Sequence, residues 1–244
     1  MSRASRTARA LAALTAALVL LVSMPARPAQ SGASAQPRRP SQQTPPKPKT
    51  RLFRAQDLGL LEAPDREEWQ KPDQIMDALR IAEGSAVADL GAGSGWFTMQ
   101  LAKRVGPNGI VYAEDIQPPM IEYIGERARR ENLRWVRPIL GTATDPNLPS
   151  PVDAVLIVDT YHEVDDPIVF FRNAAKYLKP QGLIGVVDFL PGGGGPGPAP
   201  EDRPNPKAVT EAAEAAGLQL VKREDIPPFV FLLVFERATS GEAR

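Results

Sequence analysis

The stretch Val87-Ala-Asp-Leu-Gly-Ala-Gly-Ser-Gly95 decides the fold of this protein. It begins within an apolar run, residues 86–90, that is typical of a buried strand, and it ends with glycines at positions 91, 93 and 95. Residues 96–105, which follow directly, have the apolar spacing of a helix. Glycines between a strand and a helix allow a sharp turn and let a ligand lie against backbone that a Cβ would block. We therefore expect a ligand-binding strand–loop–helix unit here.

The residue types around this loop indicate which ligand it takes. A dinucleotide fingerprint would need its third glycine at position 96, which is Trp96, and no Gly-Lys-Ser/Thr sequence of a phosphate-binding loop follows. Asp89 lies just before the turn, where its carboxylate would repel a pyrophosphate but attract an ammonium or a sulfonium. The loop therefore favours a cationic nucleoside over a phosphate.

Alternating helix and strand patterns fill the chain on both sides of the loop. Strands are predicted at residues 86–90, 110–113, 134–139, 152–158, 183–187, 218–222 and 229–235, and helices at 65–81, 96–105, 118–132, 166–178 and 206–216. Strands separated by helices indicate βαβ units, whereas the last two strands are joined too closely for a helical crossover. The expected fold class is α/β: a Rossmann-like open sheet of seven strands, mostly parallel with the last strand antiparallel, and helices on both faces.

A second acidic position lies at the end of the strand that follows the glycine loop. Glu114 and Asp115 come about 20 residues after the last glycine, where an acid can bind both ribose hydroxyls of a nucleoside. We favour Asp115, because strand alternation should turn Glu114 to the opposite face.

Charge and composition exclude several classes of function. Ten of the 29 basic residues precede Asp57, whereas all 29 acidic residues lie at or after it. The chain from Asp57 onward is therefore acidic, which disfavours nucleic acid as a partner. The chain has no cysteine and a single histidine, His162, so a thiolate or multi-histidine metal site is excluded and no metal is expected.

Residues 1–55 differ in composition from the rest of the chain. Residues 10–22 are an uncharged apolar run preceded by Arg3, Arg6 and Arg9, with cleavage options after Ala33 or Ala35. This is the layout of a secretory signal peptide, and the run is shorter than the about 20 residues that span a bilayer. We expect a signal peptide at residues 1–35, a disordered Pro-rich linker at 36–55 and a folded domain at 56–240. The mature protein would be periplasmic or secreted, without a stable membrane anchor; a cytoplasmic or membrane-anchored protein is the alternative.

The sequence resembles the class I S-adenosylmethionine-dependent methyltransferases. The resemblance covers about residues 69–237 and is carried, in the family's order, by VADLGAGSGWFTMQLA from Val87, VYAEDIQPPMIEYI from Val111, VDAVLIVDTYHEV from Val152 and LKPQGLIGVVDF from Leu178. The subgroup resembled is the small-molecule type related to the methyltransferases of quinone biosynthesis. Within it, the upstream stretch Arg66-Glu-Glu-Trp-Gln-Lys-Pro72 points to a less characterised set.

The resemblance implies S-adenosyl-L-methionine as the cofactor and residues that bind it. A family acid expected directly after Gly141 is replaced by Thr142. The implied cofactor-binding residues are Asp89, Gly91, Ala92, Gly93 and Gly95 at the methionine end, Asp115 at the ribose, Ile116 against the adenine, Thr142 and Ala143 (or Asp145) near the adenine amino group, and Asp159, whose segment faces both cofactor and substrate.

These expectations lead to methyl transfer to a small-molecule acceptor by in-line displacement. His162 is the candidate catalytic residue, as a general base for an acceptor that must lose a proton. A non-catalytic periplasmic module that binds the cofactor and a dinucleotide-dependent oxidoreductase are the alternatives. Trp69 and Trp96 can stack on the cofactor or pack in the core, and the glycine-rich residues 191–204 can form a flap over the acceptor or a low-complexity insertion. The oligomeric state is not predicted.

Overall fold

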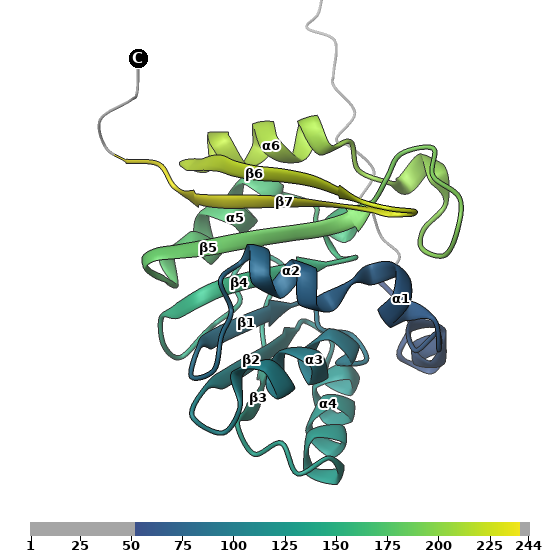
Figure 1. The fold of residues 1–244 in the computed structure, drawn as a ribbon, viewed down its shortest axis with the longest axis vertical. Helices are drawn as coiled ribbons and strands as arrows, with labels where there is room; N and C mark the ends of the chain where they lie inside the picture. Colours follow the sequence, from purple (N-terminus) through teal and green to yellow (C-terminus); the bar gives the residue numbers. More distant parts are fainter. Residues whose placement is uncertain (1–51, 240–244) are drawn as a thin grey trace, which may run out of the picture. The chain divides into compact units, whose positions relative to one another are not determined.

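The structure, a computed structural model, describes residues 52–239. An open β-sheet lies at the centre of this part of the chain (Figure 1). Its seven strands lie in the order β3-β2-β1-β4-β5-β7-β6, and β7 is antiparallel to both of its neighbours while the other pairs are parallel. The expected fold class is confirmed. The strands are β1 (Ala86–Leu90), β2 (Ile110–Asp115), β3 (Val136–Leu140), β4 (Val152–Val158), β5 (Leu178–Phe189), β6 (Leu218–Ile226) and β7 (Val230–Arg237).

Helices cover both faces of this sheet, as predicted. Helices α2, α3 and α4 contribute to one core cluster, and α5 and α6 to the other. The helices are α1 (Arg66–Gln70), α2 (Pro72–Ala78), α3 (Trp96–Val105), α4 (Pro118–Arg130), α5 (Pro167–Lys176) and α6 (Pro206–Ala215), with 3-10 turns at Ala55–Leu61, Tyr161–Glu163 and Pro200–Asp202.

The central strands are apolar on both sides because each side meets its own core. In β4, Leu156 belongs to the cluster under α2 and α3, whereas Val155 and Ile157 belong to the cluster under α5 and α6. Parallel strands that are buried on both faces have nearly continuous apolar sequences, and the sequence of β4 is of this kind. The two cores hold the strand ends, and with them the loops that follow β1, β2, β4 and β5, in a fixed arrangement.

The predicted helix at residues 65–81 is wrong in one respect, since two helices occupy this stretch. Helix α1 ends at Gln70 and α2 begins at Pro72, and Lys71 between them has a φ of 51°. Proline disfavours the helical region for the residue before it and has no N–H to continue the preceding helix. Pro72 therefore begins a new helix, and Trp69 is turned toward the sheet edge.

The predicted strand at residues 183–187 is longer than expected. Strand β5 begins at Leu178, and residues 179–182 form an irregularity between two paired parts of it, because Leu178 pairs with Val152 and Leu183 with Ala154. The other predicted helices and strands are present with ends shifted by up to a few residues.

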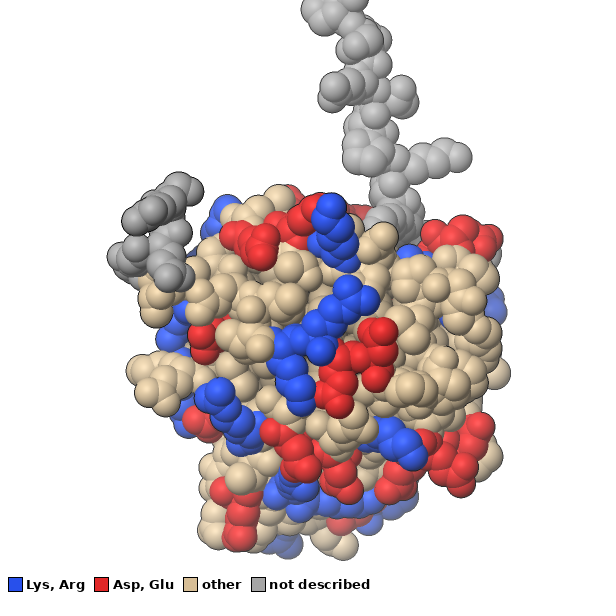
Figure 2. Space-filling view, turned by 45° about the horizontal axis from the view of Figure 1, so that its top comes forward, with Lys and Arg blue, Asp and Glu red and all other residues tan. Residues whose placement is uncertain are grey.

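The surface view in Figure 2 shows basic and acidic side chains interspersed over the face it displays. Within residues 52–239, no helix combines the length and the apolar character that a membrane-crossing segment requires. The predicted signal peptide and most of the predicted linker lie outside the described residues.

Candidate cofactor-binding and catalytic site

A cavity of about 1050 Å³ lies at the carboxyl ends of the parallel strands. This is the edge at which open α/β sheets bind their ligands, and the volume reaches the upper end of the about 300–1,000 Å³ of ligand sites. The predicted site residues that line it are Gly91, Gly93, Asp115, Ile116, Thr142, Ala143, Asp159 and His162. The tertiary structure therefore brings most of the predicted site together.

The glycine loop after β1 forms one wall of the cavity. Gly91, Gly93 and Gly95 have φ values of 71°, 54° and 74°, in the left-handed region that favours glycine. A Cβ at Gly91 would lie 2.2 Å from Cγ2 of Thr160, which follows β4. The loop thus needs glycine at position 91 both for its backbone conformation and for its close approach to the next strand.

Two neighbouring acids at the end of β2 hold this loop. The N–H of Gly93 donates to Oδ2 of Asp115 at 3.0 Å, and the N–H of Gly91 donates to Oε2 of Glu114 at 3.4 Å. Both acids line the cavity, so the opposite orientation predicted for Glu114 does not remove it from the cavity wall. The reason is that the glycine loop wraps around the end of β2 and meets both of its faces.

Burial of these acids changes their protonation. Burial, with repulsion from Asp115 as the next cause, raises the pKa of Glu114 to about 8. Burial also raises the pKa of Asp115, while hydrogen bonds from the backbone at Gln117, Gly93 and Ile116 oppose that rise. Asp115 is therefore the more readily ionised of the two, which suits an acceptor of ribose hydroxyl bonds.

Asp89, Ala92 and Gly95 do not line the cavity. Asp89 is 2% exposed, and its Oδ2 accepts a 2.6 Å hydrogen bond from Oγ1 of Thr98 on α3. Burial raises its pKa to about 6. Asp89 thus lies behind the glycine loop and ties β1 to α3, and its direct contact with a cofactor stays a prediction.

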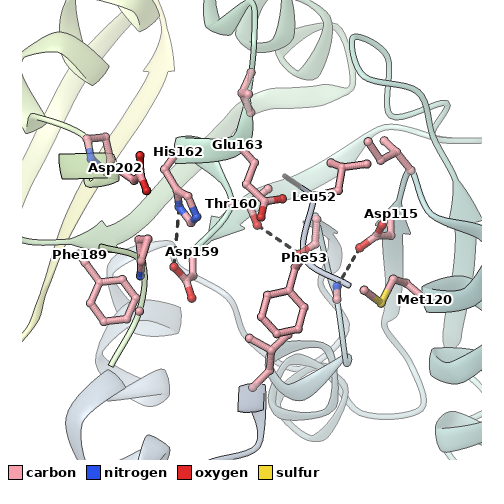
Figure 3. A pocket seen from close by; sticks show the side chains of 18 of the residues that line it. Leu52, Phe53, Asp115, Met120, Asp159, Thr160, His162, Glu163, Phe189 and Asp202 are labelled. Carbon is pink, nitrogen blue, oxygen red and sulfur yellow. Dashed lines mark hydrogen bonds and ion pairs between the residues drawn. The ribbon is translucent and has the colours of Figure 1, made fainter. Parts of the chain in front are cut away.

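A histidine and two aspartates from three segments meet on the other side of the cavity. Figure 3 shows two of them, His162 and Asp159. His162 Nδ1 lies 3.4 Å from Oδ2 of Asp188, which is fully buried at the end of β5, and 3.8 Å from Oδ1 of Asp159, which follows β4. Asp188 has no local sequence signal of a site residue, because only the pairing of β4 with β5 places it beside His162.

These three groups perturb one another. Burial and repulsion from Asp188 raise the pKa of Asp159 to about 7, although His162 and Arg66 oppose the rise. Burial lowers the pKa of His162, but the hydrogen bond to Asp188 and the charges of Asp188, Asp159 and Glu163 raise it by more, so the net direction is upward. The two carboxylates therefore leave an excess of negative charge that attracts a proton or another cation.

Arg66 lines the cavity, although its role in the site was not predicted from the sequence. It is buried, its Nη1 donates to the Leu61 carbonyl at 2.7 Å, and its guanidinium lies 4.5 Å from the centre of the Trp96 ring. Trp69, three residues on, lines the cavity and packs against Phe189 and Phe229. The upstream stretch that marked the family resemblance is thus part of the site, and it was the signal that could have identified Arg66.

Part of the glycine-rich stretch at residues 191–204, namely residues 196–198 and 201–204, lines the cavity. Arg203 is 9% exposed, and its guanidinium donates to the carbonyls of Leu190, Gly193, Gly194, Pro196 and Pro198. The buried Arg203 guanidinium thus binds several carbonyls of this loop at once and stabilises its conformation, although the loop has few apolar side chains.

The segment before α1 closes the cavity from a third side. Leu52 and Phe53, which the domain prediction assigned to the linker, line the cavity together with Leu60 and Leu61. The Phe53 carbonyl accepts a 3.0 Å hydrogen bond from Nε2 of Gln117, and the Phe53 backbone hydrogen-bonds the Glu163 carboxylate. No sequence signal marked these residues, because they lie in a short segment without a motif.

The fold, the glycine loop and the cavity at the strand ends define a Rossmann-like α/β protein with a candidate ligand site. Residues 87–182 match the family model of a methyltransferase domain. The match supports the predicted class I S-adenosylmethionine-dependent methyltransferase type for this part of the chain. The match also disfavours the dinucleotide-dependent oxidoreductase.

Individual relatives agree with the family match. The chain is 29% identical over 122 residues to a demethylmenaquinone methyltransferase of Lactobacillus johnsonii, covering 49% of each protein. It is 28% identical over 122 residues to a (S)-coclaurine N-methyltransferase of Thalictrum flavum subsp. glaucum, covering 50% of this chain and 34% of that enzyme. The chain thus spans half or less of the length of these curated relatives.

A solved structure extends the likeness beyond the matched region. The crystal structure of a SAM-dependent methyltransferase from Aquifex aeolicus superposes with a TM-score of 0.71 and 26% identity, over 75% of this chain and 98% of that one. Likeness over nearly the whole of that protein agrees with a methyltransferase fold that extends beyond residues 87–182.

Proposed function

We propose that this protein is an enzyme that transfers a methyl group from S-adenosyl-L-methionine to a small-molecule acceptor. The observation that carries the proposal is the convergence of the glycine loop, Asp115 and the Asp159–His162 pair on one cavity within a methyltransferase domain. The acceptor is taken to be small because the relatives named above act, by their names, on a quinone precursor and an alkaloid.

The residues of the cavity fit this cofactor. Asp115 is placed to accept from the ribose hydroxyls, and Ile116 lies beside it for the adenine. Arg66 is the candidate partner for the methionine carboxylate, since Arg203 is engaged by its five carbonyls. The unpaired buried oxygen Oδ1 of Asp159 suits a positively charged group. The backbone at Gly93 can approach the ligand closely, because a Cβ there would fill space beside Leu61.

The chain's own contribution to the reaction is positioning and proton transfer. When bound, S-adenosyl-L-methionine supplies a methyl group on positively charged sulfur that is already activated for displacement. The cavity walls align the acceptor with that methyl group and exclude water, which accounts for much of the rate enhancement in such a displacement. His162, held by Asp188, takes the proton from an acceptor that must lose one, with its Nε2 as the accepting atom.

Calorimetry on the full-length chain tests the function directly. S-adenosylhomocysteine should bind one site per chain, and S-adenosylmethionine should be consumed in the presence of an acceptor. Binding without turnover on any acceptor would instead favour the non-catalytic module. Binding of NAD with neither of these compounds would favour the oxidoreductase.

We also propose that the protein is exported through a signal peptide at residues 1–35. The support is the arginine-rich start followed by the uncharged run at residues 10–22 and the small residues after it. Mass spectrometry of the mature N-terminus in cells tests this. A chain that begins after Ala33 or Ala35 supports export, whereas an intact N-terminus in the cytoplasm contradicts it.

A further inference from the structure

The cavity has two chemically different ends. Figure 3 shows Asp115 and Met120 on one side, and Asp159, His162 and Asp202 together on the other. The proposed cofactor occupies the Asp115 side with its ribose, so the second side is left for the acceptor. This second side is called the acceptor end below.

The acceptor end is lined by more acids than cations. Asp159, Glu163, Glu201 and Asp202 all line the cavity there, and the guanidinium of Arg203 is engaged by backbone carbonyls of residues 190–198. Among residues 52–239, Asp159 forms an ion pair only with His162, which is itself shared with Asp188. The charge of Arg66, which also lines the cavity, acts on Asp159 without forming such a pair. The acceptor end is therefore negatively charged whenever Asp159 and Asp188 are ionised.

Asp159 carries a second, independent sign of a missing partner. Its Oδ1 is buried and accepts no hydrogen bond. An unpaired buried carboxylate oxygen is destabilising unless a donor or a cation reaches it, and the raised pKa of Asp159, about 7, expresses that need. Asp159 lines the cavity and its side chain is 18% exposed, so a cationic ligand can approach the carboxylate from there.

Amine and anionic acceptors differ in the charge that they bring to this end of the cavity. Methyl transfer to an amine moves the positive charge from sulfur to the acceptor nitrogen, toward these carboxylates. Methyl transfer to a phenolate or a carboxylate would need an anion among acids before reaction. Fixed negative charge stabilises a transition state in which positive charge develops and opposes the entry of an anion.

From these observations we propose that the acceptor is an amine, held as an ammonium by Asp159 and deprotonated by His162. This inference rests on the proposed methyl transfer and names its substrate class. Trp69, Phe53 and Phe189 line the same cavity, so the amine carries an apolar or aromatic body. Such side chains bury the apolar part of a ligand while the carboxylate fixes its nitrogen.

The reaction balances with groups that the chain provides. The ammonium donates a proton to Nε2 of His162, and the resulting imidazolium is stabilised by Asp188 at Nδ1. The freed nitrogen lone pair forms the N–C bond as the C–S bond breaks, and that electron pair stays on sulfur as a neutral thioether. The methylated nitrogen becomes a cation beside Asp159, and the proton on His162 passes to solvent.

The same three side chains could also hold a metal ion, since their ligand atoms lie within 4.8 Å of one another. One observation favours the amine: Asp188 is fully buried and does not line the cavity. The metal remains a distinguishable outcome of the experiment below.

The test measures binding to the full-length chain saturated with S-adenosylhomocysteine, so that it does not depend on turnover. Calorimetry at about pH 8, where both amine and Asp159 are charged, compares 2-phenylethylamine, 2-phenylethanol and 3-phenylpropionate, which share one aromatic body. We expect the amine to bind about tenfold or more tightly than the alcohol and the carboxylate to bind weakest, as for a charge-assisted hydrogen bond. Ring-substituted sets of the same three compounds extend the comparison.

Two variants test whether the preference for the amine over the alcohol depends on Asp159. Asp159→Asn should bring the amine-to-alcohol affinity ratio close to one, whereas Asp225→Asn, an exposed aspartate of β6 that does not line the cavity, should leave it unchanged. A ratio near one in the parent protein across all sets, preference for the carboxylate, or amine binding abolished by EDTA and restored by Mn²⁺ would overturn the inference. Failure of S-adenosylhomocysteine itself to bind would instead count against the proposed function.

Discussion

Gly91→Ala tests whether the glycine loop is packed as tightly as the structure has it. Gly91 has a φ of 71°, and alanine in this left-handed region is less stable by about 1–2 kcal/mol. The new Cβ would also lie 2.2 Å from Cγ2 and 2.6 Å from Oγ1 of Thr160, and overpacking of this kind destabilises by about 1–3 kcal/mol. Together these effects predict a loss of about 2–5 kcal/mol from a typical stability of about 5–15 kcal/mol.

A second substitution separates the two effects. Thr160→Ala removes Cγ2 and Oγ1 and leaves only Cβ, 2.9 Å from the new methyl group. By itself this change loses the hydroxyl bonds to the carbonyls of Gly91 and Val158, worth about 1 kcal/mol. Added to Gly91→Ala, it should recover part of the overpacking and none of the backbone strain.

Urea denaturation of the full-length variants measures these differences, and calorimetry with S-adenosylhomocysteine measures their effect on the site. Gly194→Ala is the matched control, because its Cβ would meet nothing within 4 Å and its φ is not positive. We expect that control to stay within about 0.5 kcal/mol of the parent protein. The reasoning is refuted if Gly91→Ala is as stable as Gly194→Ala, or if Thr160→Ala adds fully to the loss with no recovery.

Four further predictions follow from the site. Asp115→Ala should weaken S-adenosylhomocysteine binding by about 10- to 100-fold, since it removes the expected ribose bonds and the bond from the Gly93 N–H; unchanged calorimetry would remove Asp115 from the site. Arg66→Met should weaken the same ligand but not adenosine, which has no carboxylate, and equal losses for both would contradict its assignment. His162→Gln should lower turnover about 10²- to 10⁴-fold with S-adenosylhomocysteine affinity retained, and unchanged turnover would exclude it as the base. The pKa values of Glu114 and Asp159 are higher in the folded state than in the unfolded state. Their contribution to the free energy of unfolding is therefore complete below about pH 4 and is lost as the pH rises to about 8. Urea denaturation midpoints that rise over this pH range would contradict the burial of these groups.

Local sequence patterns were sufficient for the sheet and for the nucleoside end of the site. Each strand is a short apolar run with turn residues beside it, and Gly91, Gly93 and Asp115 lie in or directly after such runs. The information that places them is contained within a few residues of chain, because strand direction and the crossover rule fix which strand ends share an edge. The break between α1 and α2 at Lys71 shows the limit of periodicity, since the apolar spacing continues across a proline that ends the helix.

The acceptor end was decided by the tertiary structure. In the sequence, Asp188 has no feature that separates it from the buried strand beside it. Only the register of β4 with β5 brings its Oδ2 to 3.4 Å from Nδ1 of His162, which is 26 residues away in the chain. The same is true of Leu52 and Phe53, whose place on the cavity depends on contacts with Gln117 and Glu163 far along the chain. The amino-acid sequence thus determined the helices, the strands and the glycine loop, because those depend on backbone preferences of neighbouring residues. The charge balance by which we propose that the acceptor is selected arises from side chains on separate elements, and it exists only once the sheet has aligned them and removed them from water.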